Sequence, residues 1–320
     1  MKRIKTAVIG AGYLGRFHAQ KYAALEETEL TAVVDIDREQ AEKVASECGS
    51  RPFTSYKDVL DEIDAASVVV PTTFHHQVAR DLLKAGKHIL LEKPMTVTLQ
   101  EADELIELAD QQGLVLQVGH LERFNPAIVT LEKEVSAPLF IEAHRLSGFK
   151  LRATDVDVVL DLMIHDIDIV LALVNAEVKE IRAAGVPVLT PRVDIANVRI
   201  IFENGCTANL TASRISLRDL RRIRVFQQGA YIAADCTERN NLIVRGQDAL
   251  NNPFSIRPNF IEHEQSDNLM EEIKDFVAAV QGKKPPKVDG RAGRRALDLA
   301  SRINAAILEG LESAGIKGVL

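Results

Sequence analysis

The sequence predicts an α/β protein of two domains, a doubly wound parallel sheet followed by a domain with a large, mainly antiparallel open sheet. Three observations support this. Near the N-terminus a short apolar run leads directly into three glycines and a helical pattern. Predicted strands and helices then alternate to about residue 120, and beyond that point strands dominate. We expect the first domain at 1–121 and the second at 122–320.

The stretch from Lys5 to Gly15 has the pattern of a dinucleotide-binding turn. Gly10 permits the tight turn from strand to helix, and Gly12 lets backbone N–H groups approach a diphosphate. The diphosphate would rest at the helix N-terminus, where unpaired N–H donors and the helix dipole favour negative charge. The residues predicted to contact the cofactor here are Gly10, Gly12, Tyr13, Leu14 and Gly15.

The next apolar run ends at Asp35, twenty positions beyond Gly15. A carboxylate there is placed to accept hydrogen bonds from the adenosine ribose hydroxyls, and it would repel the 2′-phosphate of NADP. Together with the glycines, this strand, helix and strand predict a Rossmann domain that binds NAD.

Composition narrows the class of protein. The chain has 320 residues, of which 46% are hydrophobic and 27% charged, as in ordinary globular proteins of two domains. A net charge of −7 argues against nucleic acid as a partner. No apolar run approaches the roughly 18 to 20 residues that span a bilayer, so we expect no membrane contact and a cytoplasmic location. The scattered Cys48, Cys206 and Cys236 favour reduced thiols over disulfides or zinc ligands.

Two further strand ends carry candidate cofactor contacts. A buried strand closes at Pro71, and the loop after it holds Thr72 and His75, at the sheet edge where such folds bind ligands. His75 contacts the cofactor or belongs to a polar helix start. The next strand ends at Glu92 and Lys93. Lys93 would lie beside the nicotinamide, whose positive ring depresses the lysine pKa, or it reaches solvent.

A predicted helix over 156–174 carries the second group of polar residues. Asp161 and His165 are four residues apart, which places them on one helix face. Because the rest of the helix is apolar, these groups need partners. They are either a satisfied core histidine with capping carboxylates or a histidine base oriented by a carboxylate, and the nicotinamide site and Lys93 favour the base. A metal site is not expected, because no second histidine or cysteine lies at ligand spacing.

The second half predicts an antiparallel sheet that continues to about residue 265. Asn204 and Gly205, between two alternating runs, indicate a hairpin. Two helices end the chain, and we expect the last one, at 291–312, to pack back on the first domain. The open sheet is the expected surface for a homo-oligomer, a dimer or tetramer.

Candidate substrate contacts follow the last strand of the first domain, at His120, Arg123 and Asn125, and lie in a basic stretch that includes Arg152. Guanidinium groups suit bidentate phosphate recognition. Arg145 and Lys150 belong to the same basic stretch as Arg152. A second basic run either meets phosphate or forms a solvated strand face or subunit contact, and it consists of Arg218, Arg221, Arg222 and Arg224.

The glycine-rich turn, Asp35, the EKP sequence at 92–94 and DLMIHDID at 161–168 together resemble the glucose-fructose oxidoreductase/inositol dehydrogenase/rhizopine catabolism (Gfo/Idh/MocA) family. The resemblance covers nearly the whole chain. It implies NAD(P)-dependent oxidation of a sugar hydroxyl, with Lys93, Asp161 and His165 as catalytic residues. Either His165 or Lys93 would be the base, and we favour His165.

A narrower similarity lies in 118–128, 154–170 and 209–227. These segments resemble the members of the family that oxidise C3 of UDP-N-acetylglucosamine in the synthesis of amino-sugar lipid A precursors. The expected substrate is therefore a nucleotide sugar. The alternatives are a free sugar or inositol-type polyol, and, in another class, an NAD-binding sensor without turnover.

Overall fold

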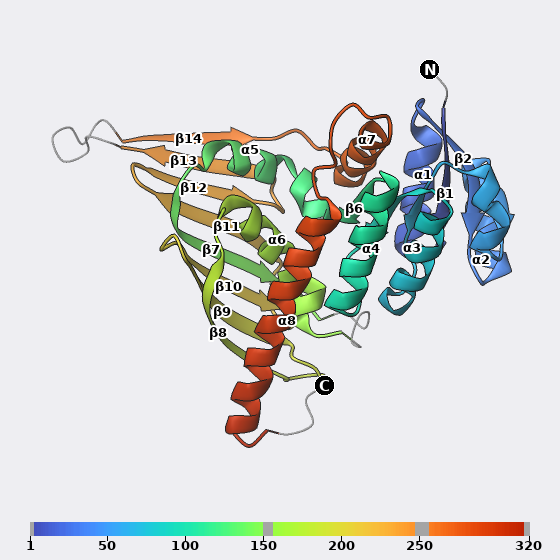
Figure 1. The fold of residues 1–320 in the computed structure, drawn as a ribbon. Coiled ribbons are helices and arrows are strands. Elements are labelled where there is room, and N and C mark those ends of the chain that lie inside the picture. The colour runs from blue at the N-terminus through green and yellow to red at the C-terminus, as the bar shows by residue number, and fades with distance from the viewer. Residues whose placement is uncertain (1–2, 150–155, 247–255, 317–320) are drawn as a thin grey trace. The chain divides into compact units, whose positions relative to one another are not determined.

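The computed structural model describes residues 3–149, 156–246 and 256–316, which form two compact units (Figure 1). Unit 1 comprises Met1–Leu121 and Asp267–Arg294, and unit 2 comprises Glu122–Ser266 and Arg295–Leu320. The sequence predicted a second domain unbroken from 122 to 320. The structure differs, because Ile273 and Phe276 on a late helix pack into the core of unit 1 beside Tyr22.

Unit 1 is built on a six-stranded parallel sheet, as predicted, in the order β3-β2-β1-β4-β5-β6. The strand order reverses between β1 and β4. In open α/β sheets the cofactor binds at the carboxyl ends of the strands beside such a reversal. The strands are β1 Ile4–Ile9, β2 Thr28–Val34, β3 Arg51–Phe53, β4 Ala65–Val68, β5 His88–Glu92 and β6 Leu116–Gly119.

The helices of unit 1 begin at local capping signals. Asp37 accepts backbone N–H groups at the start of α2, and Thr98 and Glu101 form a capping box at the start of α4. Because crossovers are right-handed, the reversal places α1 and α2 on one face of the sheet and α3 and α4 on the other. The helices are α1 Tyr13–Ala24, α2 Arg38–Cys48, α3 His75–Lys84, α4 Leu99–Gln112 and α7 Asn268–Val280, with 3₁₀ turns at Tyr56–Glu62 and Thr72–Phe74.

Unit 2 contains an eight-stranded sheet in the order β14-β13-β12-β11-β7-β10-β9-β8. It is mainly antiparallel, as predicted, and β7 and β10 form its parallel pair. The predicted hairpin at Asn204 and Gly205 joins β9 to β10, with Gly205 at φ +84°. The strands are β7 Pro138–Leu146, β8 Val178–Val186, β9 Ile195–Phe202, β10 Thr207–Ser213, β11 Leu220–Gln227, β12 Ala230–Asp235, β13 Asn240–Arg245 and β14 Arg257–Glu262.

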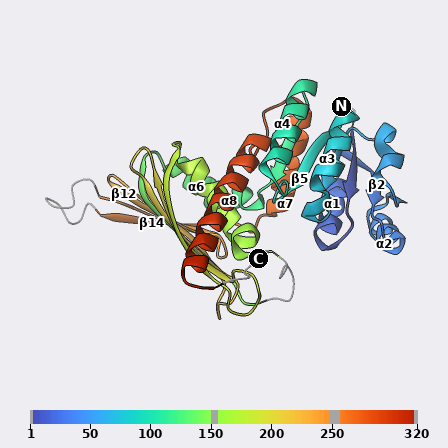
Figure 2. The ribbon, with the colours of Figure 1, turned by 60° about the horizontal axis from the view of Figure 1, so that its bottom comes forward.

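Helices cover one face of this sheet and build the core of unit 2 with it (Figure 2). They are α5 Pro126–Glu134, α6 Ile164–Leu173 and the later part of α8 Gly290–Ser313, and a short 3₁₀ turn spans Leu121–Phe124. In the described residues, no helix covers the opposite face. Nor is any described helix long and apolar enough to span a bilayer.

The expected helix over 156–174 is not uniform. Val159–Met163 forms a π turn, and α6 follows it. Asp157 starts this segment, because its Oδ1 accepts the N–H groups of Val159 and Leu160 at 2.8 and 3.0 Å. The π turn holds Asp161, and such turns occur frequently at functional sites.

Candidate active site

The glycine-rich turn has the geometry that a diphosphate requires. Gly10 has φ +96°, and a Cβ there would lie 2.5 Å from the carbonyl oxygen of Val69. A Cβ on Gly15 would lie 1.8 Å from the oxygen of Gly10. No atom lies within 4 Å of a Cβ placed on Gly12, and neither a capping side chain nor an acidic residue occupies the first turn of α1. The helix N-terminus is therefore open to an anion.

Asp35 lies at the end of β2 and faces this turn. Its Oδ2 accepts the N–H of Ala11 at 2.7 Å, and its Oδ1 accepts the N–H of Asp37 at 2.9 Å. Asp35 also lines a cavity of about 650 Å³ within unit 1. The cavity lies at the carboxyl ends of β1, β2 and β4, and its size suits a cofactor site. Its other lining residues include Gly10, Gly12, Ile36, Thr54, Tyr56, Val70, Pro71, Phe74 and Gln77.

Sequence reasoning missed the apolar walls of this cavity. Ile36 is 95% exposed and Phe74 is 58% exposed, and both side chains line this cavity, where they offer apolar surface to a ligand. Their positions in the sequence could have identified them. Ile36 directly follows Asp35, and Phe74 lies in the loop after Pro71, and both of these strand ends were already expected to contact the cofactor. These features together fit NAD.

The loop after β4 meets the turn after β5 through His75. The ring of His75 is buried, with Nε2 2.8 Å from the oxygen of Val70 and Nδ1 2.8 Å from the oxygen of Pro94. Burial lowers the pKa of His75, although the two carbonyl groups oppose this shift. His75 therefore joins two loops, while Pro71 lines the cavity and half-buried Thr72 begins the 3₁₀ turn.

At the end of β5, Glu92 and Lys93 lie in different surroundings. The Glu92 carboxylate is buried, with Oε1 3.2 Å from Nε2 of His18, and its Oε2 accepts the backbone N–H of Lys93. Glu92 is absent from the lining of the 650 Å³ cavity. The Lys93 side chain is half-buried.

The acidic residues around His165 differ in burial and in their partners. Asp166 and Asp168 are buried and pair with Arg145 and Arg123, whereas Asp161 and His165 are only half-buried. Among these four side chains, Asp161 and His165 are thus the two that keep partial exposure. In the part of the chain that the structure describes, no three His, Cys, Asp or Glu side chains gather as metal ligands.

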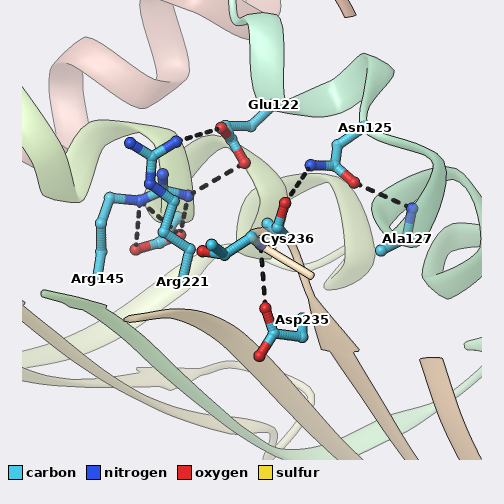
Figure 3. Close-up of polar contacts among 9 residues, drawn as sticks. Glu122, Asn125, Ala127, Arg145, Arg221, Asp235 and Cys236 are labelled. Carbon is cyan, nitrogen blue, oxygen red and sulfur yellow. Dashed lines mark hydrogen bonds and ion pairs between the residues drawn. The ribbon is translucent and has the colours of Figure 1, made fainter. Parts of the chain in front are cut away.

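An ionic network built around buried Arg145, Asp166 and Glu122 holds α6 to the sheet (Figure 3). Arg145 on β7 donates to both oxygens of Asp166, at 2.7 to 3.1 Å. Glu122 lies between two guanidinium groups, 3.7 Å from Arg145 and 3.3 Å from Arg221. Burial disfavours the charged guanidinium and by itself would lower the pKa of Arg145. The negative charges of Asp166 and Glu122 have the larger effect, so the pKa of Arg145 is raised.

Most of the predicted substrate contacts are engaged within the protein. Arg123 pairs with Glu132 and Asp168, at 2.6 and 3.4 Å. Asn125 caps α5 and donates to the carbonyl oxygen of Cys236 at 3.0 Å. His120 is buried in unit 1.

Several of the basic residues expected to bind phosphate also pair with carboxylates of the protein. Arg145 and Arg221 belong to the ionic network, in which the Arg221 side chain is 47% exposed, and Arg224 pairs with Glu142 on the neighbouring strand β7. Arg152 and Lys150 lie outside the described residues.

Residues 4–120 match the oxidoreductase family with an NAD-binding Rossmann fold, and residues 141–232 match the GFO/IDH/MocA C-terminal domain. The chain is 41% identical to UDP-N-acetylglucosamine 3-dehydrogenase of Acidithiobacillus ferrooxidans, over 96% of this chain and 98% of that protein. A solved structure of that enzyme has a TM-score of 0.90 to this chain, with the same identity and coverage.

A second solved structure supports the fold alone. Scyllo-inositol dehydrogenase from Lactobacillus casei, with bound NAD(H) and scyllo-inositol, has a TM-score of 0.81 at 19% identity. It covers 97% of this chain and 98% of its own.

Proposed function

The chain belongs to the Gfo/Idh/MocA family of NAD-dependent oxidoreductases, and we propose that it oxidises the C3 hydroxyl of UDP-N-acetylglucosamine to a ketone. The assignment of the substrate rests on one observation. The similarity to a UDP-N-acetylglucosamine 3-dehydrogenase runs the full length of both chains at 41% identity. The product is a 3-keto nucleotide sugar, and NAD is reduced to NADH.

Residues of unit 1 hold the cofactor in this proposal. The N–H groups at the start of α1, at Gly12, Tyr13 and Leu14, bind the diphosphate. Asp35 accepts from the adenosine ribose, and Ile36 and Phe74 enclose the adenine. When bound, NAD supplies the acceptor for the hydride that leaves C3.

Three side chains act at the C3 hydroxyl. His165 takes the proton of that hydroxyl as its O–H bond breaks and the C=O bond forms, and it then gives the proton up to Lys93. Lys93 orients the same hydroxyl, stabilises negative charge on its oxygen and relays the proton received from His165 to solvent. Asp161 anchors the imidazole or the sugar. The partial exposure of Asp161 and His165, while Asp166 and Asp168 are buried and paired with arginines, supports this choice of residues.

The direct experiment is to follow NADH absorbance with NAD and a panel of UDP-sugars, free sugars and inositols. An aminotransferase that removes the keto product is included, because alcohol oxidation by NAD is uphill. NADH formed with UDP-N-acetylglucosamine supports the proposal. Turnover of a free polyol alone would show that the substrate is a polyol and not a nucleotide sugar. NAD binding without any turnover would indicate a sensor.

We further propose that the enzyme is a cytoplasmic homo-oligomer that associates through the uncovered face of the eight-stranded sheet. That face carries an aromatic row in which Phe226 lies 5.6 Å from Phe140 and 5.0 Å from Tyr231 between ring centroids. Large partly exposed aromatic side chains favour an interface. Light scattering on the wild type and on Phe226→Asp tests this, and a wild-type monomer would refute it.

A further inference from the structure

A line of buried polar contacts runs through unit 1 from α1 to the backbone of Lys93. The hydroxyl of Tyr22 lies 2.8 Å from Oγ of Ser67, and that Oγ lies 3.0 Å from Nδ1 of His18. His18 Nε2 lies 3.2 Å from Oε1 of Glu92, whose Oε2 accepts the N–H of Lys93 at 3.2 Å. These contacts connect α1, β4 and the end of β5 to the residue proposed to orient the substrate hydroxyl.

The surroundings leave this line little room to move. The side chain of His18 is fully buried, and that of Glu92 is 11% exposed. Gly119 on β6 lies against the Glu92 carboxylate, because a Cβ on Gly119 would come within 2.9 Å of it. Close packing on this scale keeps a side chain in a single position.

Two further ionisable groups interact electrostatically with Glu92, namely His75 on α3 and Glu272 on α7. Burial, followed by the charges of Glu92 and Asp275, raises the pKa of Glu272 well above its ordinary value. Asp275 itself pairs with Lys284. Among the contacts described, the hydrogen-bonding neighbours of the Glu92 carboxylate are His18 and the N–H of Lys93.

We propose that His18 is a positioning residue that acts on Lys93 through Glu92. His18 follows Gly15 by one helical turn, in the helix whose N-terminus is proposed to hold the diphosphate. The contact would fix the Lys93 backbone relative to the cofactor. This inference rests on the proposed function, since Lys93 must act in the reaction, and it gives Glu92 a structural task instead of the cofactor contact expected from the sequence.

Two variants of the same residue test the inference. A glutamine amide reaches the place of Nε2, so His18→Gln keeps a contact to Glu92. An asparagine amide reaches only the place of Nδ1, so His18→Asn keeps the contact to Ser67 and loses Glu92. We expect kcat to fall about tenfold or more in His18→Asn and to stay within about threefold in His18→Gln, with the Kd for NAD unchanged in both.

A double-mutant cycle separates positioning from general damage to the fold. In a Lys93→Met background, His18→Asn should cause no further loss, because the residue through which it acts is gone. Equal losses in the two His18 variants, or a full additional loss in the Lys93→Met background, would overturn the inference. If His18→Asn does not fold, Glu92→Gln replaces it, and an unchanged kcat in that variant would overturn the inference equally.

A readout without turnover distinguishes this inference from the proposed function. If the wild type reduces no NAD with any sugar, the proposed function fails, but acetylation of Lys93 by acetic anhydride can still be followed by peptide mass spectrometry. We expect His18→Asn to change the Lys93 rate about threefold or more relative to His18→Gln, with exposed Lys84 as the unaffected control. Identical Lys93 rates in the two variants would contradict the inference.

Discussion

The carboxylate of Asp35 accepts a hydrogen bond from the backbone N–H of Ala11, with 2.7 Å between Oδ2 and the nitrogen. Ala11 lies between Gly10 and Gly12, so one side chain at the end of β2 fixes the turn that is proposed to receive the diphosphate. Asp35 therefore shapes the cofactor site as well as supplying a charge to it.

Replacing Asp35 with Asn should weaken NAD binding and reduce the discrimination against NADP. The amide oxygen can still accept from Ala11, but the negative charge that binds ribose hydroxyls and repels a 2′-phosphate is lost. We expect a loss of about tenfold in NAD affinity, which corresponds to one charge-assisted hydrogen bond. Titrations with NAD and NADP measure it. Asp37→Asn, which alters only the cap of α2, is the control, and an unchanged preference in Asp35→Asn would contradict the assignment.

Lys93→Met should abolish most turnover while NAD still binds. Methionine keeps the length and apolar stem of lysine but cannot orient a hydroxyl or transfer a proton, and such groups contribute about 10²- to 10⁴-fold to rate. Steady-state kinetics and a separate NAD titration measure the two effects. Lys84→Met, at an exposed position on α3, should retain wild-type kcat. A near-normal rate in Lys93→Met would defeat the catalytic assignment.

His75 should make stability depend on pH. Its pKa is lowered in the folded state from the ordinary 6.5, mainly by burial. The unfolded state therefore binds more protons, and the stabilisation present above about pH 6.5 is lost as pH falls toward the folded pKa. Urea unfolding at about pH 7.5 and about pH 5.5 should show a smaller loss in His75→Gln than in the wild type. His88 and His263, whose pKa values burial also lowers, contribute equally to both proteins. Equal losses would count against a buried neutral His75.

Removing one partner of the Arg145–Asp166 pair should lower the free energy of unfolding more than replacing both partners with apolar residues. Arg145→Met removes the hydrogen-bonded partner of the buried Asp166 carboxylate, which we expect to lower the free energy of unfolding by about 3 to 5 kcal/mol. Arg145→Met with Asp166→Leu should recover most of that loss, because an apolar pair needs no charge compensation. Arg182→Met, from an ion pair whose arginine side chain is 73% exposed, should cost less than about 1 kcal/mol. Denaturant unfolding compares them, and a double variant as unstable as the single one would refute the account.

The sequence predicted best what depends on neighbouring residues. The strand, glycines and helix around Gly10 form one continuous signal, and the strand carrying Asp35 follows at a fixed distance. The hairpin at Asn204 and Gly205 is equally local. The confirmed fold class follows from such alternation along the chain.

The parts that escaped prediction depend on residues far apart in sequence. Asp166 meets Arg145 only because of how α6 lies on β7, and sequence spacing cannot reveal that partner. The return of residues 267–294 to unit 1 depends on Phe276 packing beside Tyr22. The π turn at Asp161 likewise interrupts a pattern that reads as an ordinary helix.

The most direct measurement follows a deuterium atom. UDP-N-acetylglucosamine labelled with deuterium at C3 is incubated with the enzyme and NAD, and the NADH formed is examined by mass spectrometry. The account predicts that the label appears in NADH and that substrate labelled at C4 transfers none. NADH that forms from the C3-labelled sugar without the label, or no NADH formation at all, would contradict it.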